Sequence, residues 1–182
     1  MFQAELVKIA QAFHAANVPY MVIGGQAVLL YGESRLTDDI DITLGLDSSQ
    51  FNKIKNIVES IGFVSNVDEQ FVLRTNVFPV LDTESGIRID LIFSFTEYER
   101  EAIERATLYV IENTSVHFAS IEDVIIHKIF AGRARDLDDV CGILIRNSVF
   151  DSSYIERWLR VFEIELGKDF SITFATLMEK KY

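Results

Sequence analysis

The sequence has little cysteine and proline, and it has no long apolar run. It contains one cysteine, Cys141, and two prolines among 182 residues. A single cysteine excludes an internal disulfide. The apolar content of 49% and the scarcity of proline argue against a disordered chain. Charged residues break every apolar stretch well short of the ~18 residues that a membrane-spanning helix requires. These features predict a folded, water-soluble protein that is not inserted in a membrane.

Positive charge is also scarce, with 17 lysines and arginines against 28 aspartates and glutamates and a net charge of −11. A surface of that sign repels a polyanion, so nucleic acid is not the partner that composition favours. The densest basic group is formed by Lys128, Arg133 and Arg135. The N-terminus has no basic start, apolar stretch or cleavage site of a secretion signal, so we expect a cytoplasmic protein.

Hydrophobic periodicity predicts a mixed α/β core followed by a helical C-terminal part. We expect the whole chain, 1–182, to form a single domain, with a core at 1–118 and a helical extension at 119–182 packed on it. Periodicity of about 3.6 residues predicts helices at 3–16, 26–31, 51–61, 96–105, 121–130, 137–146, 153–166 and 171–180. Runs of β-branched and aromatic residues predict strands at 20–23, 39–44, 71–74, 77–80, 87–93, 108–111 and 116–118.

Two aspartates separated by one residue, Asp39 and Asp41, begin one of the predicted strands. Side chains at positions i and i+2 of a strand project from the same face, so the two carboxylates can hold one divalent cation together. A glycine pair, Gly24 and Gly25, lies between the strand at 20–23 and a short helix. Such a turn can present backbone N–H groups to an anion, so the pattern favours phosphate chemistry. The alternative for the pair is a plain strand-to-helix turn, and for the aspartates an exposed acidic strand end.

These residues resemble the signature of the DNA polymerase β nucleotidyltransferase superfamily. The resemblance rests on a linked set of motifs: Gly24-Gly25-x-Ala27, Gly32, Arg35-x-Thr37-x-Asp39-Ile40-Asp41, Asp90 in an apolar run, Asp123-x-x-x-x-Lys128 and Arg135-Asp136-x-x-Asp139. The downstream motifs are similar to those of bacterial members, which include nucleotidyltransferase-like toxins of abortive-infection toxin–antitoxin systems.

The resemblance implies an α+β fold, in which flanking helices cover a small twisted mixed sheet. It implies that a nucleoside monophosphate passes from a triphosphate to a hydroxyl with the help of two magnesium ions. Asp39, Asp41 and Asp90 would then be the catalytic and metal-binding residues. Asp39 and Asp41 would bridge both ions, and Asp90 would complete the site at the attacking hydroxyl.

A second set of residues is expected to bind the nucleotide: Gly24, Gly25, Arg35, Thr37, Lys128 and Asp136. Structural alternatives stay open for most of them. Arg35 can form a salt bridge instead of gripping a phosphate, and Lys128 can lie at a core edge instead of contacting the triphosphate. Arg133 and Arg135 can pair with Asp136 and Asp139, and we expect such pairing for at least one arginine.

The sequence does not identify the acceptor, which can be an RNA end, a protein hydroxyl or a small molecule of the antibiotic type. A homodimer or an antitoxin partner also stays open, as does a nucleotide-binding module without turnover. The three histidines, His14, His117 and His127, show no spacing typical of a zinc site and are assigned no role.

Overall fold

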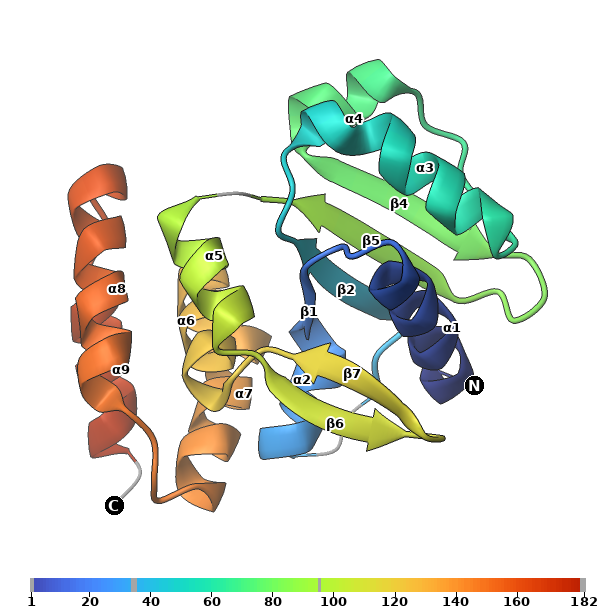
Figure 1. Cartoon of the computed structure of the whole chain (residues 1–182). Coiled ribbons are helices and arrows are strands. Elements are labelled where there is room, and N and C mark those ends of the chain that lie inside the picture. The colour runs from blue at the N-terminus through green and yellow to red at the C-terminus, as the bar shows by residue number, and fades with distance from the viewer. Residues whose placement is uncertain (1, 34–35, 95, 181–182) are drawn as a thin grey trace. The chain divides into compact units, whose positions relative to one another are not determined.

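The computed structural model describes residues 2–33, 36–94 and 96–180 (Figure 1). Arg35 lies outside the described residues. The chain divides into two compact units, the first formed by Met1–Gln26 and Leu36–Ala119 and the second by Ala27–Arg35 and Ser120–Tyr182. The short helix α2 (Gly24–Tyr31) contributes residues to both units. Single-domain organisation of the whole chain stays a prediction.

A seven-stranded sheet forms the centre of the first unit, in the order β3-β4-β5-β2-β1-β7-β6. The pairs β1·β7 and β2·β5 are parallel and the other four pairs are antiparallel, so the sheet is mixed, as expected. The strands are β1 (Tyr20–Ile23), β2 (Asp39–Leu44), β3 (Phe63–Val64), β4 (Val77–Asp82), β5 (Arg88–Phe93), β6 (Thr107–Ile111) and β7 (Thr114–Phe118).

Apolar side chains fix this sheet within the first unit. All four residues of β1 are buried, which is typical of a central strand, whereas β5 and the first half of β2 bury alternate residues. Helix α1 (Phe2–Ala15) packs on β7 and on α3 (Phe51–Ser60), and α3 also packs on β3. The unit also contains the 3-10 turn η1 (Ser48–Gln50), α4 (Glu69–Thr75) and α5 (Glu97–Glu104). The α+β fold class is therefore confirmed.

The strand predicted at 71–74 is wrong, because these residues belong to helix α4. The Asp68 side chain accepts a hydrogen bond from the backbone N–H of Phe71 at 2.8 Å and so caps the helix. Asn76 ends it in the left-handed conformation, with φ of 55°. The β propensity of Phe71 and Val72 is thus overridden by a cap that lies outside the apolar run.

The second unit is helical after residue 119. Helix α6 (Ile121–Ala131) packs against α7 (Ala134–Arg146), α8 (Ser152–Leu166) and α9 (Phe170–Glu179). Ser120 caps α6, since its side chain accepts from the backbone N–H of Asp123. The Asp123 carboxylate is fully buried and accepts from the hydroxyls of Ser120 at 2.6 Å and Tyr154 at 2.9 Å. This network ties α8 to the start of α6.

Residues 27–33 also belong to the second unit, which the sequence did not predict. The side-chain amide of Asn147 at the end of α7 donates to the backbone oxygen of Tyr31 at 2.7 Å. At Gly32, a Cβ would lie 3.1 Å from Ile143 of α7, so this segment is packed closely on α7. Among the described residues, no helix combines the length and apolar character needed to cross a membrane.

Candidate functional site

The structure brings Asp39, Asp41 and Asp90 together at adjacent strands of the sheet. Strands β2 and β5 pair in parallel, with Asp41 opposite Asp90 and Asp39 opposite Arg88. Each aspartate offers a carboxylate oxygen, and these oxygens lie within 4.8 Å of one another. Ile40 between the two β2 aspartates is fully buried, because alternate residues of a strand face opposite sides. Asp90, which lies 49 positions after Asp41 in the sequence, therefore joins the two β2 aspartates in one acidic cluster.

Arg88 is a member of the cluster that the sequence reasoning missed. Its guanidinium donates to Asp39 Oδ2 at 2.8 Å and lies 3.5 Å from Asp90 Oδ2. The side chain is 56% exposed, so these ion pairs are partly screened by solvent. Arg88 lies two residues before Asp90 on the same strand face, and that spacing is the only sequence signal that could have identified it.

The pKa of Asp90 reflects the negative charge gathered in the acidic cluster. Burial raises the pKa of Asp90, and the Asp39 carboxylate raises it further, while the Arg88 guanidinium opposes both effects. The net result is a pKa above the ordinary value for aspartate. Crowded carboxylates of this kind favour either a shared proton or a bound cation.

Gly24 makes room for Asp41. It has φ of +62° at the start of α2, a conformation that favours glycine. A Cβ added at Gly24 would overlap the carboxylate of Asp41, so no larger residue fits beside that side chain. The absence of a side chain at Gly24 therefore allows the start of α2 to lie directly against the acidic cluster. The second member, Gly25, is also within α2.

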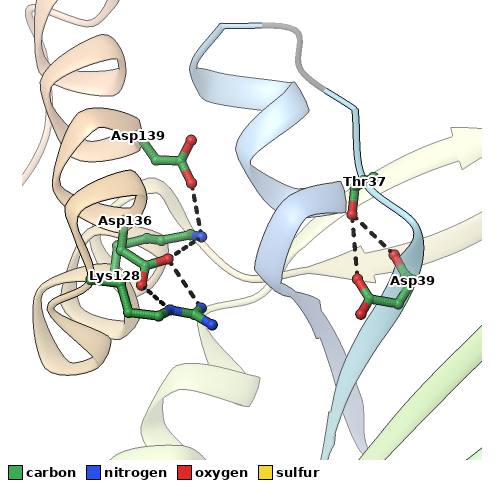
Figure 2. Close-up of polar contacts among 6 residues, drawn as sticks. Thr37, Asp39, Lys128, Asp136 and Asp139 are labelled. Carbon is green, nitrogen blue, oxygen red and sulfur yellow. Dashed lines mark hydrogen bonds and ion pairs between the residues drawn. The ribbon is translucent and has the colours of Figure 1, made fainter.

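Two further polar side chains adjoin these segments. The Thr37 hydroxyl donates to the backbone oxygen of Asp39 at 3.3 Å and lies 3.5 Å from its Oδ1 (Figure 2). Gln26, the third residue of α2, is 7% exposed, and its Nε2 has no hydrogen-bond partner among the described residues. A buried donor without a partner costs about 1–3 kcal/mol, so Gln26 is a candidate for contact with a ligand, which the sequence did not indicate.

Lys128 forms a charged network within the second unit. Its ammonium lies 2.8 Å from Asp136 Oδ1 and 2.8 Å from Asp139 Oδ2, and its side chain is 7% exposed (Figure 2). Arg133 donates to Asp136 Oδ2 at 2.6 Å, which confirms the pairing expected for at least one arginine. Burial would raise the pKa of Asp136, but hydrogen bonds from Arg133 and Lys128 outweigh it and hold the pKa below its usual value. Nucleotide binding by Lys128 and Asp136 stays a prediction.

The acidic cluster fits a hard divalent cation. Magnesium takes oxygen ligands almost exclusively, and three carboxylates from two adjacent strands supply them. All three side chains are half-buried, so solvent and substrate oxygens can complete the coordination. When no cation is bound, the Arg88 guanidinium supplies positive charge beside the carboxylates of Asp39 and Asp90.

A comparison with protein families matches residues 3–159 to a family described as nucleotidyltransferase of unknown function, DUF6036. The match covers most of the chain. The chain belongs to this nucleotidyltransferase family. Its members share the superfamily that the glycine pair and aspartates indicated, so that prediction is confirmed. A comparison with curated proteins finds no match.

Solved structures of similar fold include three nucleotidyltransferase-like proteins. An antigenic nucleotidyltransferase-like protein from Paracoccidioides brasiliensis has a TM-score of 0.59 at 15% identity, covering 97% of this chain and 91% of that one. LnuA, a lincosamide antibiotic adenylyltransferase with bound lincomycin, has a TM-score of 0.54 at 18% identity, covering 77% and 94%. ANT(2")-Ia in complex with adenylyl-2"-tobramycin has 0.50 at 19% identity, covering 99% and 98%. At these identities the likeness shows the shared fold.

Replacing Gly24 by alanine should disable the acidic cluster. The added Cβ meets the Asp41 carboxylate and must displace it, so the three carboxylates can no longer converge on one cation. We expect Mn²⁺, used as a paramagnetic substitute for magnesium, to bind at least ten-fold more weakly. Gly86→Ala is the matched control, because Gly86 also has positive φ, of +73°, but no atom lies within 4 Å of its added Cβ. Equal Mn²⁺ affinity in the two variants would contradict this role of Gly24.

Asp90→Asn should stabilise the metal-free protein at neutral pH. Because the pKa of Asp90 is raised, its carboxyl binds a proton more tightly in the folded chain than in the unfolded chain. The protonated Asp90 makes its full contribution to stability below pH ~3.9, the pKa of aspartate in an unfolded chain. This contribution is lost as the pH rises through the higher pKa of Asp90 in the folded chain. Asparagine is neutral throughout, so the unfolding temperature at pH 7.5 should shift upward.

The same comparison near pH 4 should give a much smaller difference between the two proteins. Asp38→Asn serves as the control, since Asp38 is an exposed neighbour. An Asp90→Asn variant that is less stable than the parent at pH 7.5 would refute this account of the cluster.

Proposed function

We propose that the protein is a magnesium-dependent nucleotidyltransferase that transfers a nucleoside monophosphate from a nucleoside triphosphate to a hydroxyl group. The observation that carries the proposal is the convergence of Asp39, Asp41 and Asp90 within 4.8 Å beside a glycine-started helix. When bound, two divalent ions would acidify the acceptor hydroxyl and offset the charge of the departing pyrophosphate. The carboxylates of Asp39, Asp41 and Asp90 would hold these ions.

The protein's own groups have defined tasks in the transfer. The acceptor oxygen forms a bond to the α-phosphorus while the bond from that phosphorus to the pyrophosphate oxygen breaks. The hydroxyl proton passes to Asp90, the carboxylate that this proposal places at the attacking hydroxyl. The Arg88 guanidinium, which lies at Asp39 and Asp90, helps to balance the charge of the carboxylates before the substrate arrives.

The triphosphate is expected at the start of α2, where backbone N–H groups of the glycine turn carry partial positive charge. In this proposal the buried Nε2 of Gln26 donates to a phosphate oxygen, which accounts for its lack of a protein partner. Thr37, Lys128 and Asp136 remain proposed nucleotide-binding residues, and so does Arg35.

A small hydroxyl compound is the acceptor we favour. The net charge of −11 opposes binding of bulk RNA and suits a neutral or cationic molecule. Two similar folds, LnuA and ANT(2")-Ia, belong to proteins described with lincomycin and with adenylyl-tobramycin. Both are covered almost entirely by this chain, at 94% and 98% of their length, so a chain of this size accommodates such chemistry.

A toxin-like enzyme that modifies an RNA end or a protein hydroxyl is the second candidate. It is favoured by the motifs at Lys128 and at Asp136 with Asp139, which resemble those of toxin–antitoxin systems. For either candidate, we propose a cytoplasmic location and a second copy of the chain or an antitoxin as a protein partner. A third candidate is a module that binds nucleotide without turnover.

Gln26→Met should weaken triphosphate binding without weakening the fold. Methionine keeps the length of the side chain and removes a buried donor that has no described partner, so the unfolding temperature should stay equal or rise. We expect the dissociation constant for a triphosphate with magnesium to rise about ten-fold, as for loss of a hydrogen bond to a charged group. Isothermal titration calorimetry measures this, and unchanged affinity would remove Gln26 from the site.

Incubation with each α-labelled nucleoside triphosphate and magnesium tests the transfer itself. Acceptors are a metabolite extract, a panel of hydroxyl compounds, bulk transfer RNA and the protein alone. We expect label to move to a small molecule, and Asp41→Asn should lower the rate by at least ~1,000-fold because a bridging carboxylate is lost. Glu84→Gln, which removes one acidic charge in an exposed turn, is the control.

The outcomes of this assay separate the candidates. Label on transfer RNA or on protein would support the toxin-like enzyme instead of the small-molecule enzyme. Label that moves equally well with Asp41→Asn would refute the proposed mechanism. Tight triphosphate binding with no labelled acceptor would support the non-catalytic module.

A further inference from the structure

Two histidines far apart in the sequence meet on the first unit. His14 lies in the last turn of α1 and His117 lies on β7, and these two elements pack together. Nε2 of His14 is 3.4 Å from Nδ1 of His117, and the ring planes are inclined at 81°. The contact is exposed to solvent. The proposed transfer reaction uses neither residue.

The distance between the two ring nitrogens is informative. Hydrogen bonds from N–H donors cluster near 2.9–3.0 Å, so 3.4 Å is long for a direct bond between two imidazoles. Zinc binds imidazole nitrogen at about 2.0–2.1 Å, and two such bonds at a tetrahedral angle place the nitrogens about 3.3–3.4 Å apart. The observed separation therefore equals the bite of a two-histidine chelate.

The surrounding residues hold the two rings in place. Tyr20 is 2% exposed, and its ring centroid lies 5.2 Å from that of His117 and 5.9 Å from that of His14. The backbone N–H of His117 donates to the Tyr20 hydroxyl at 3.4 Å. One turn before His14, the Gln11 side-chain amide donates to the Thr114 hydroxyl at 3.0 Å, which fixes α1 against β7 a second time. The pair is thus preorganised on its inner side and open to water on its outer side.

We propose that His14 and His117 form a binding site for a borderline transition-metal cation such as Zn²⁺, Ni²⁺ or Cu²⁺, distinct from the acidic cluster. The ligands would be His14 Nε2 and His117 Nδ1, and water would complete the coordination. Imidazole nitrogen suits these metals, whereas magnesium prefers oxygen, so the two sites select different ions. Metal binding would link α1 to β7.

The exposure of the contact leaves room for the water ligands that two imidazoles alone do not supply. With only two protein ligands, we expect a dissociation constant on the order of micromolar, far weaker than a structural four-ligand zinc site.

The test is a zinc titration by calorimetry of protein without a histidine tag, in the Asp41→Asn background and with millimolar magnesium. That background weakens zinc binding by the acidic cluster. We expect one equivalent of zinc, at least ten-fold weaker binding in His14→Gln and in His117→Asn, and no change in His127→Gln, which removes the third histidine. Zinc should also raise the unfolding temperature of the background protein, but not that of His14→Gln.

Copper provides a second readout that a purely structural role would not change. The electron paramagnetic resonance spectrum of one Cu²⁺ equivalent should show two coordinated imidazole nitrogens, and His14→Gln should reduce the number to one. Zinc binding that is equal in the background protein and in His14→Gln would overturn the proposal. Absence of any zinc binding would overturn it too. Neither result depends on whether the protein transfers nucleotides.

Discussion

The parallel pairing of β2 with β5 holds three carboxylates together against their mutual repulsion, and the candidate site depends on it. The pairing places Asp41 beside Asp90, and the buried residues Ile40 and Leu91 fix which face each strand presents. A shift of one residue would turn the aspartates into the core, where burying a charge is far more costly. The apolar face of the sheet thus supplies the free energy that keeps the acidic cluster assembled. Arg88 reduces the remaining repulsion, and a divalent cation would reduce it further.

Sequence reasoning identified the elements of the site that depend on local pattern. The alternation around Asp39 and Asp41 fixes their common face within a strand, and the apolar periodicity after residue 120 predicts the helix that forms there, α6. The strand assigned to residues 71–74 was wrong because the deciding interaction, the cap from Asp68, lies outside the apolar run. The role of Gly24 in making room for Asp41 could not be predicted, since it depends on how β1 and α2 approach β2.

Contacts between distant residues account for the other omissions. His14 and His117 are 103 residues apart, and no spacing rule for metal sites relates a helix end to a strand of an unknown sheet. Arg88 became relevant only when the β2·β5 register placed it opposite Asp39. Residues 27–33 were expected in the core because of their position in the sequence, yet Asn147 and Ile143 hold them in the second unit. In each case the missing information is tertiary pairing, which composition and periodicity do not contain.

The Lys128 network limits how this lysine can contribute to nucleotide binding. Its ammonium already contacts the carboxylates of Asp136 and Asp139 at 2.8 Å, and with Arg133 the four charges sum to zero. A triphosphate that recruited the ammonium would leave Asp139 without this partner in a buried position, and breaking a buried pair costs about 3–5 kcal/mol. Direct contact therefore requires the network to open at that cost. A contact between Lys128 and a triphosphate, which stays a proposal, therefore competes with the ion pairs that join α6 to α7.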